Sequence, residues 1–431
     1  NGDGVGDLKG LEQKLDYLRN QLNVTALWLG PVYPSPMVDL GQDVTDFKDI
    51  DPMFGTLEEF THMKTAMHKK GMKLIMDFIP NHVSNQHAWF QLSKKSKADD
   101  NEHRDYFIWH DGKETGGARP DPPNNWLSVY GGPAWTWDEE RQQYYYHTYL
   151  SEQPDLNLRN PVVQEEMKEV MRFWLAKGVD GFSVDSAANL FESANLTNDE
   201  GSMLGGSSNS YSSHQHPHTT FQPETYQFIV ELREIIDASA AMDGKPKFLM
   251  VDSAGGNLNQ TMTFYEYMGK PGAHLSVDHY LAEITDSEDA LSIHNLVRNW
   301  MQNLPQNAWA NWATGGPDYS RVATRMGSPD WTNAITMLTT TLPGTTVTYY
   351  GEEIGMHDVQ VAWEDTVDPL AKKAGQSGYE DVSRDFQRTP MQWSGKPNAG
   401  FSAANSTWLP VANDYMENNV KAQLAHGAGV S

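Results

Sequence analysis

The sequence of 431 residues contains no cysteine. Because the cysteine thiolate is the form that attacks substrates and binds metals, this absence excludes disulfides within the chain, thiolate metal sites and a cysteine nucleophile. Basic residues are scarce as well, since 32 Lys and Arg stand against 57 Asp and Glu and give a formal net charge of −25. So acidic a surface repels phosphate backbones, and nucleic acid is therefore not an expected partner.

Long apolar runs are also missing, because no run reaches the roughly 18 residues that a membrane-spanning helix needs. No secretory signal pattern opens the sequence, which starts without Met in the turn-like run Asn-Gly-Asp-Gly. We therefore expect a piece of a longer protein, with any anchor or targeting segment upstream. What is present, 39% hydrophobic and 11% aromatic residues, suffices for a large core and excludes global disorder.

Short apolar runs alternate with helical patterns along most of the chain. Leucines from Leu8 to Leu22 recur at steps of three and four, which predicts an amphipathic helix. Thr56 and Asn160 are suited to cap two further helices. Seven strands are predicted between such helices, at residues 26–30, 73–77, 179–185, 247–252, 274–278, 309–313 and 345–350.

Strands separated by helices imply parallel, right-handed β-α-β units. We prefer a (β/α)₈ barrel to an open doubly wound sheet, because no Gly-rich dinucleotide turn follows any predicted strand. The eighth strand would be the first of the barrel and would lie upstream of this sequence.

The alternation breaks between residues 83 and 158, a stretch too long for an ordinary barrel loop. We expect a small inserted domain there, so the predicted division is barrel 1–82, inserted domain 83–158, barrel 159–394 and tail 395–431. The insertion gathers nine aromatic residues: Trp109, Trp126, Trp135, Trp137, Tyr130, Tyr144, Tyr145, Tyr146 and Tyr149. Since 76 residues can hardly bury all nine rings, we expect some of them to stay exposed for a protein contact.

Four aspartates stand at or just after the ends of predicted strands. Asp77, Asp185 and Asp252 end the strands that close at these residues, and Asp318 follows the strand 309–313. One such Asp is more often a cap or turn residue, but four at the carboxyl ends of barrel strands favour a site. Paired carboxylates in tryptophan-rich surroundings fit glycoside chemistry, in which one carboxyl group is the nucleophile and the other the acid.

The residues around these positions resemble glycoside hydrolase family 13, and most closely its maltase and oligo-1,6-glucosidase branch. The motifs that carry the resemblance are DFIPNH at 77–82, GFSVD at 181–185, YPSP at 33–36, YYGEE at 349–353 and QPDLN at 153–157. The resemblance implies an α-amylase-type barrel with an inserted domain B, and a C-terminal β-sandwich beyond the sequence. It implies that Asp185, Asp252 and Asp318 hold the catalytic positions. The implied remainder of the substrate pocket is Asp39, Asp77, His82, Ser183, Pro317 and Arg321.

Four positions depart from the active branch. Ser183 stands where that branch has Arg, Asp252 where it has Glu, Pro317 where it has His, and Gln42 where it has a stacking Tyr. Without the arginine, Asp185 loses its fixed cationic partner. An acid that is one methylene shorter is displaced by about 1 Å, which can cost on the order of a hundredfold in rate. These losses predict a degenerate catalytic site, although a working enzyme with unusual substitutions stays an alternative.

Ser183 and the GGPD run at 315–318 also resemble the rBAT-like heavy subunits of heteromeric amino-acid transporters. That resemblance implies a single-span type II protein whose amylase-like domain lies outside the plasma membrane. It implies a multi-span light subunit as partner, joined by a disulfide upstream of this chain, together with self-association. Asp252 departs here too, since these subunits keep Glu. The alternatives are an active, retaining α-glucosidase and a cell-surface binding or receptor protein of the same fold.

The resemblances further imply structural Ca²⁺. The heavy-subunit type implies a site made of Asn81, Asp155, the backbone carbonyls of Asn189 and Leu190, and Glu192. The glucosidase type has a loop like Asn1, Asp3, the Val5 carbonyl and Asp7, whose alternating oxygens suit a hard cation, although such a run is also an ordinary turn. Asn-x-Ser/Thr motifs make Asn23, Asn195, Asn259 and Asn405 candidate glycosylation sites.

Overall fold

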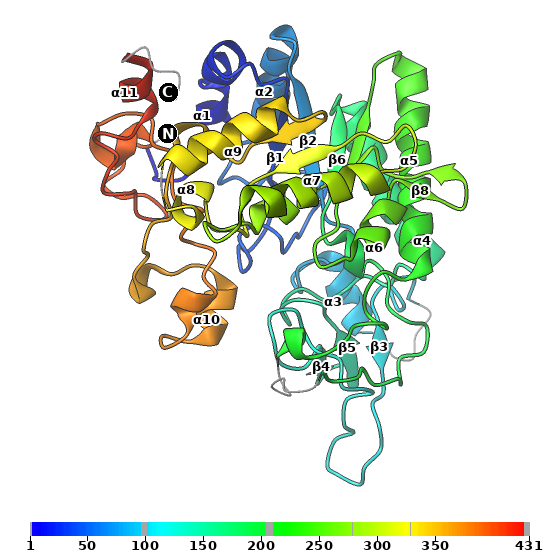
Figure 1. The fold of residues 1–431 in the computed structure, drawn as a ribbon. Coiled ribbons are helices and arrows are strands. Elements are labelled where there is room, and N and C mark those ends of the chain that lie inside the picture. Colours follow the sequence, from blue (N-terminus) through cyan, green and yellow to red (C-terminus); the bar gives the residue numbers. More distant parts are fainter. Residues whose placement is uncertain (1, 96–100, 204–209, 278, 328, 426–431) are drawn as a thin grey trace. The chain divides into compact units, whose positions relative to one another are not determined.

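The computed structural model describes residues 2–95, 101–203, 210–277, 279–327 and 329–425. Figure 1 shows the fold of the chain. The chain divides into two compact units. Unit 1 comprises Asn1–Gln21, Met53–Gly55 and Leu275–Ser431, and unit 2 comprises Leu22–Pro52 and Thr56–His274. Each unit is described below by itself.

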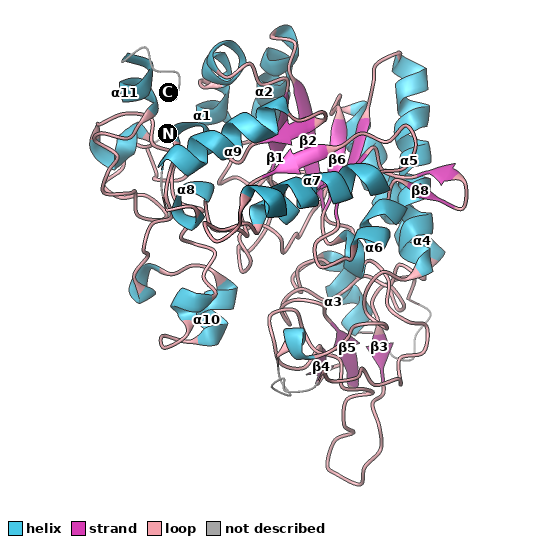
Figure 2. Ribbon diagram, in the orientation of Figure 1, coloured by secondary structure: helices cyan, strands magenta, loops and turns pink. Residues whose placement is uncertain are grey.

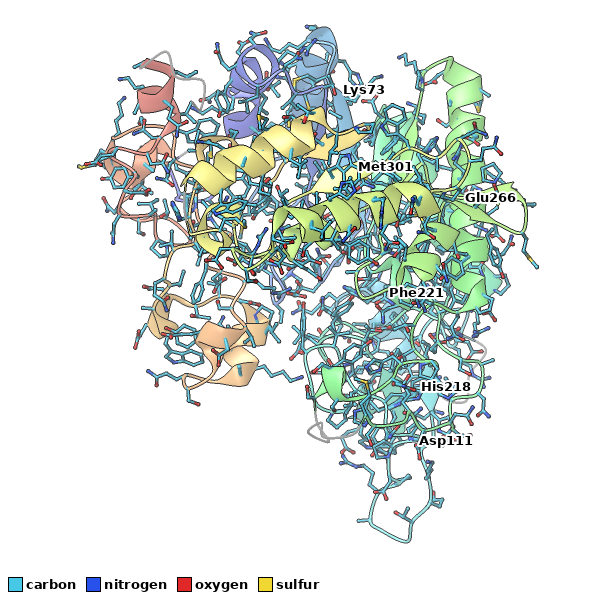
Figure 3. The ribbon with its side chains drawn as sticks, in the orientation of Figure 1. Lys73, Asp111, His218, Phe221, Glu266 and Met301 are labelled. Carbon is cyan, nitrogen blue, oxygen red and sulfur yellow. The ribbon has the colours of Figure 1, made fainter. Side chains whose placement is uncertain are left out.

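Unit 2 is built on a parallel sheet with strand order β1-β2-β6-β7. The strands are β1 (Ala26–Leu29), β2 (Lys73–Phe78), β6 (Gly181–Val184) and β7 (Phe248–Asp252). β6 is buried along its whole length, as expected for the run Gly-Phe-Ser-Val in a parallel sheet covered on both faces. Lys73, labelled in Figure 3, begins β2, and its Nζ donates to Asp180 Oδ1 at 2.9 Å just before β6.

Helices alternate with these strands in unit 2 (Figure 2). They are α2 (Leu57–Lys69), α3 (Ala88–Lys94), α4 (Pro161–Ala176), α5 (Pro223–Asp243) and α6 (Leu258–Thr263). The predicted caps are confirmed. Thr56 Oγ1 accepts from the Glu59 N–H at 3.2 Å, and Asn160 Oδ1 accepts from the Val162 N–H at 3.0 Å.

The predicted insertion lies within unit 2 and has its own antiparallel sheet in the order β3-β5-β4. These strands are β3 (Trp109–His110), β4 (Trp135–Asp138) and β5 (Gln143–Tyr146). Farther along the chain, β8 (Glu266–Tyr267) and β9 (Lys270–Pro271) form a hairpin.

The expectation of exposed aromatic rings in the insertion is wrong. Trp126, Trp135, Tyr144, Tyr145 and Tyr146 are buried, and the other four rings are half-buried. The rings pack on one another around Ile108 and Ala134, and further segments of unit 2 cover them. For example, Trp126 Nε1 donates to the Asn198 carbonyl at 2.9 Å. The insertion does not have to bury its rings alone, because the 195–200 segment adds cover.

Unit 1 contains the other three predicted strands, β10 (Leu275–Val277), β11 (Asn311–Ala313) and β12 (Thr345–Val347). β11 and β12 pair in parallel, and Asn311 Nδ2 in β11 donates to the Ser276 carbonyl in β10 at 2.6 Å. The helices of this unit are α1 (Leu8–Glu12), α7 (Ala290–Asn303), α8 (Val322–Arg325), α9 (Pro329–Thr341), α10 (Pro369–Ala374) and α11 (Val420–Ala425).

The single helix predicted from Leu8 to Leu22 is wrong in its continuity. α1 ends at Glu12, and a π-helix runs from Tyr17 to Gln21. Leu8 and Leu15 are buried as the spacing predicts, but a pattern of steps of three and four does not show where a helix widens. Within the described ranges, no helix is both long enough and apolar enough to cross a membrane.

Candidate functional site

The predicted catalytic residues of unit 2 meet at the carboxyl ends of three adjacent strands. In the register of the sheet, Asp77 in β2 lies opposite Ser183 in β6, and Ser183 lies opposite Met250 in β7. Asp185 follows β6, and Asp252 is the last residue of β7. The structure therefore brings these four predicted positions to one edge of one sheet, where parallel α/β folds place their chemistry.

Asp77 is buried, with 8% of its surface exposed, and is fixed by two aromatic residues. Trp28 Nε1–H donates to its Oδ1 at 2.5 Å, and Tyr33 O–H donates to its backbone carbonyl at 2.6 Å. Trp28 lies in β1, the strand next to β2. The YPSP motif thus contributes to the site through Tyr33, which orients the end of β2.

Asp185 is held by a chain of two hydroxyl groups. Ser186 Oγ donates to Asp185 Oδ2 at 2.7 Å, and the Tyr149 hydroxyl lies 2.7 Å from Ser186 Oγ. Ser186 has the left-handed backbone angles φ 55° and ψ 30°. Sequence reasoning missed both Ser186 and Tyr149, since a serine after Asp185 is an ordinary strand-end residue and Tyr149 was counted among the packing aromatics.

Ser183 is 1% exposed, and its Oγ has no hydrogen-bond partner among the described residues. A buried hydroxyl without a partner loses its hydration without compensation. Asp252 is half-buried, and its Oδ1 accepts from the Ala254 N–H at 3.0 Å in the turn that follows β7.

Asp39 and His82, two predicted pocket residues, share Gln153. Gln153 Nε2 lies 3.1 Å from Asp39 Oδ2 and 3.1 Å from His82 Nε2. Because an amide nitrogen only donates, His82 Nε2 accepts, and its Nδ1–H donates to Asn81 Oδ1 at 2.9 Å. Burial lowers the pKa of His82 to about 4, so the ring is neutral at pH 7 and adds no positive charge to the site.

Unit 1 holds the remaining predicted positions. Asp318 Oδ1 lies 2.5 Å from Arg388 Nη2 and 3.3 Å from Arg384 Nη1, and the Asp318 side chain is 52% exposed. Pro317 contributes its carbonyl, which accepts from Arg388 Nε at 2.8 Å. Arg321 is 1% exposed and donates from Nη1 to the Tyr350 carbonyl at 2.7 Å. A proline offers no side-chain donor, so position 317 cannot donate a side-chain hydrogen bond to a ligand.

The residues of the larger predicted Ca²⁺ set come together in unit 2. Asn81 Nδ2 donates to the Asn189 carbonyl at 2.7 Å and to Asp155 Oδ2 at 3.2 Å. Burial raises the pKa of Asp155 well above its usual value and that of Glu192 to about 7, and Glu192 adds to the rise at Asp155. Leu190, which lies between Asn189 and Glu192 in the sequence, is buried. The two buried carboxyl groups and the Asn189 carbonyl are oxygen ligands of the kind that a hard cation takes, whereas Asn81 faces Asp155 and Asn189 with its Nδ2 and His82 with its Oδ1.

In the second predicted Ca²⁺ set, at the start of the chain, two aspartates accept local backbone hydrogen bonds. Asp3 Oδ1 accepts from the Val5 N–H at 2.9 Å, and Asp7 caps α1 by accepting from the Gly10 N–H at 2.6 Å. Asn1 lies outside the described residues. No group of three or more His, Cys, Asp or Glu side chains in the described ranges is placed to hold a metal ion. The Asn81 set contains two carboxyl groups, those of Asp155 and Glu192.

All four sequon asparagines are exposed: Asn23, Asn195, Asn259 and Asn405. Asn195 lies in a loop, where its Oδ1 accepts from Thr197 Oγ1 at 2.7 Å, and Asn259 lies within α6. Glycosylation at these positions stays a prediction.

Glu352 in the YYGEE motif gives a prediction about stability. Burial raises its pKa to about 7, although the Tyr349 N–H and the Thr314 hydroxyl donate to it. The unfolded chain releases this proton near pH 4.5, whereas the folded chain keeps it to about pH 7, so stability falls as the pH rises between these values. The loss is about 3 kcal/mol.

Glu352→Gln is therefore expected to flatten the decline in unfolding free energy between pH 5 and pH 8, measured by denaturant titration. Glu364→Gln, at an exposed position, is the matched control and should leave the decline unchanged. An undiminished pH dependence in Glu352→Gln would show that the buried carboxyl is not the cause.

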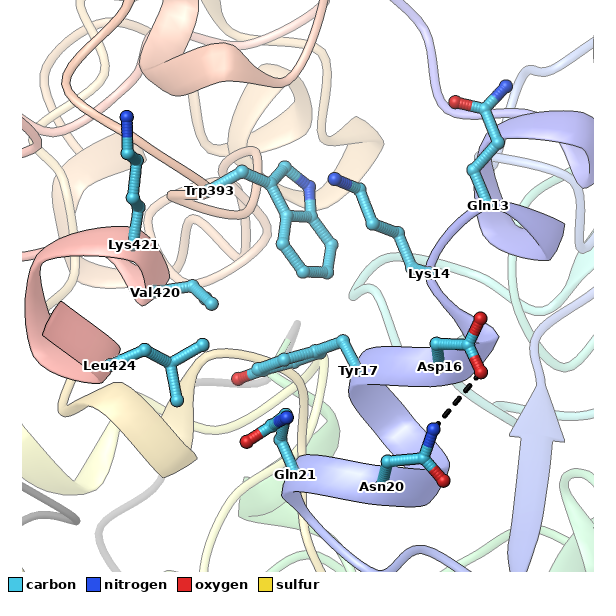
Figure 4. Close-up of a pocket in the computed structure, with 10 residues that line it drawn as sticks. All are labelled: Gln13, Lys14, Asp16, Tyr17, Asn20, Gln21, Trp393, Val420, Lys421 and Leu424. Carbon is cyan, nitrogen blue, oxygen red and sulfur yellow. Dashed lines mark hydrogen bonds between the residues drawn. The ribbon is translucent and has the colours of Figure 1, made fainter. Parts of the chain in front are cut away.

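A pocket of about 430 Å³ in unit 1 contains none of the predicted site residues. It lies among Tyr17, Trp393 and Leu424, with Asn20 Nδ2 donating to Asp16 Oδ1 at 3.1 Å on its rim (Figure 4). Its Trp393 ring is covered in part by Lys14 Nζ, 4.2 Å from the ring centroid.

Comparisons with known proteins give both of the expected resemblances. The amino acid transporter heavy chain SLC3A1 of Rattus norvegicus is 41% identical over 424 residues, covering 98% of this chain and 59% of that protein. Maltase A1 of Drosophila melanogaster is 42% identical over 437 residues, covering 98% of this chain and 74% of the maltase. The chain thus spans 59% of the length of the transporter heavy chain that it matches.

The solved structure of XgtA, an alpha-glucosyl transfer enzyme, superimposes with a TM-score of 0.89 at 34% identity, covering 99% of this chain and 78% of XgtA. Residues 1–430 match the family model for the alpha amylase catalytic domain. The predicted fold, an α-amylase-type (β/α)₈ barrel with an inserted domain, is therefore confirmed. The chain belongs to the alpha-amylase catalytic-domain family.

Proposed function

We propose that this chain is the extracellular domain of a heavy subunit of a heteromeric amino-acid transporter, in which an α-glucosidase site has lost hydrolytic activity. The observation that carries the proposal is Ser183. Its buried Oγ, without a partner in the described part of the chain, stands two residues before Asp185, where the glucosidase type has arginine. No charge-assisted bond from position 183 can orient the nucleophile.

The other departures support the same conclusion. The Asp252 carboxyl is tied to the backbone of its own turn at 3.0 Å, and Pro317 offers only a carbonyl, which Arg388 engages. Each departure removes a contact that strengthens toward the transition state, and such contacts are the ones that raise the rate. The 41% identity to a transporter heavy chain over 98% of this chain supports the assignment to that class.

The proposal includes a multi-span light subunit as partner. Because the sequence has no cysteine, the disulfide to that partner would form outside these residues, as would the single membrane span of a type II protein. It also includes Ca²⁺ held by Asn81, Asp155, Asn189, Leu190 and Glu192, and glycans on the exposed sequons. Calcium there would neutralise the two buried carboxyl groups and tie the insertion, through Asp155, to the segment after β6.

The test is to express the protein that carries this chain in membranes and analyse it on non-reducing gels. We expect a band of higher mass that contains a multi-span membrane protein and collapses on reduction. A protein recovered only in the medium, with the same mobility with and without reductant, would contradict the proposal.

A second candidate function is an active α-glucosidase. It is favoured by the 42% identity to Maltase A1 over 98% of this chain and by Asp185, which keeps its place at the end of β6. Release of glucose from maltose, considered in the Discussion, separates the two candidates.

A further inference from the structure

Position 183 holds a serine, which cannot form an ion pair with Asp185. Beyond the proposed function, the structure shows that other residues contact the Asp185 carboxyl group. The Asp185 carboxylate decides which hydroxyl group donates and which accepts in these two hydrogen bonds. A carboxylate only accepts hydrogen bonds, so the Ser186 hydroxyl donates to Asp185 Oδ2, at 2.7 Å. The Tyr149 O–H must then donate to Ser186 Oγ, also at 2.7 Å.

Tyr149 is suited to be the first donor in this series of two hydrogen bonds. Burial raises the pKa of its phenol well above the usual value, so the hydroxyl keeps its proton at neutral pH. Its ring is set by neighbours on two sides, packing edge-on to His82 at 5.3 Å and against Tyr130 at 5.4 Å. Hydrogen bonds that follow one another polarise one another. A hydroxyl group that itself accepts a hydrogen bond therefore donates more strongly to a carboxylate than one that does not.

Ser186, whose hydroxyl bonds Asp185, has a left-handed backbone, at φ 55° and ψ 30°. A residue with a side chain rarely takes this conformation, and observed outliers of this kind cluster at functional sites. The conformation turns the chain sharply after β6, so that neighbouring side chains 185 and 186 meet. Ser183 is buried with its hydroxyl unpartnered in the described ranges, and the Ser186 hydroxyl in this turn bonds the Asp185 carboxyl group.

We infer that Ser186 and Tyr149 are positioning residues that hold the Asp185 carboxyl group in place, so that Asp185 still reacts as a nucleophile with an α-glucosyl donor whose leaving group needs no acid. This inference rests on Asp185 holding the nucleophile position of the family. It is compatible with failed hydrolysis. The defect at Asp252 affects protonation of the leaving group, which fluoride does not need, and the defect at Pro317 weakens sugar binding without removing the nucleophile.

The probe is 5-fluoro-α-D-glucosyl fluoride. In the expected step, an Asp185 carboxylate oxygen forms a bond to the anomeric carbon while the carbon–fluorine bond breaks and fluoride leaves with the bonding electron pair. The product is a glucosyl ester on Asp185 that accumulates because the ring fluorine slows its breakdown. Intact-mass spectrometry follows the ester, and peptide mapping locates it.

We expect a saturable, single-site adduct on the wild-type chain and none on Asp185→Asn. Tyr149→Phe, which keeps the ring and removes the donor, should lower the maximal labelling rate about tenfold, since the Tyr149 hydroxyl no longer polarises the Ser186 hydroxyl that bonds the carboxylate. Its half-saturating probe concentration should be unchanged.

Ser186→Gly and Ser186→Ala separate the hydroxyl from the backbone turn. Glycine takes the left-handed conformation without strain, and neither residue has a donor. If the hydroxyl is what matters, both variants lose labelling rate alike; recovery in Ser186→Gly would show that only the turn matters and would overturn the inference. Tyr144→Phe, which removes a hydroxyl bonded to the Pro120 carbonyl in the insertion, is the matched control and should label as wild type does.

Absence of any adduct on the wild-type chain, or equal rates in wild type, Tyr149→Phe and Ser186→Ala, would also overturn it. Thermal unfolding of each variant shows that it is folded before labelling is compared. Failure here leaves the proposed function standing, whereas turnover of maltose contradicts the proposed function and not the positioning roles.

Discussion

Purified protein incubated with maltose is expected to release glucose at least about 10³-fold more slowly than a maltase under the same conditions. A misplaced acid costs on the order of a hundredfold, and loss of a fixed electrostatic partner costs a further factor of about 10²–10³. The first applies at Asp252, whose carboxyl is one methylene shorter than glutamate. The second applies at Ser183, which is buried and carries no charge.

The control for this measurement is Asp185→Asn, which should give the same background rate of glucose release from maltose as the wild-type chain. Robust release that disappears in Asp185→Asn would contradict the loss of hydrolysis. In that case the chain would be a retaining α-glucosidase despite its four departures.

Removal of calcium with a chelator is expected to lower the melting temperature of the protein by several degrees. A ligand that binds only the folded state stabilises it by mass action, by about 2.7 kcal/mol when its free concentration is a hundred times its Kd. Calcium would also relieve the burial of two carboxyl groups, Asp155 and Glu192, which are 1% and 5% exposed.

Glu192→Gln should reduce the chelator-induced shift, because it removes one of the two charged ligands while keeping the side-chain shape. Glu352→Gln is the matched control, since Glu352 is likewise a carboxyl group whose pKa burial raises to about 7, but it lies in unit 1. It should leave the chelator-induced shift intact. A melting temperature indifferent to chelator in the wild-type chain would remove the calcium site from the account.

Much of the fold could be predicted because its signals are local. All seven predicted strands are present, since each contains a short β-branched or apolar run of the kind that parallel sheets favour. Thr56 and Asn160 cap their helices as predicted, because a cap depends on only three or four neighbouring residues. The break after Glu12 was not predictable, because the leucine spacing is the same in an α-helix and in one that widens into a π-helix.

The candidate site was predictable in its residues but not in its contacts. Asp77, Asp185 and Asp252 could be placed because strand ends meet at one edge of a parallel sheet. The Tyr149–Ser186 chain joins residues 37 positions apart through a left-handed turn, and neither the distance nor the turn leaves a trace in composition or periodicity. Gln153, which bridges Asp39 and His82, belongs to the QPDLN motif, which carries the family resemblance but was not predicted to contribute to the pocket.

The central claim is that this fold serves a partner membrane protein and not hydrolysis. Its most direct test is surface biotinylation of an amino-acid transporter light subunit, with and without co-expression of the protein that carries this chain. The account predicts that co-expression raises the surface level of the light subunit several-fold, and equally so for Asp185→Asn. A light subunit whose surface level does not respond, or responds only while Asp185 is intact, would contradict it.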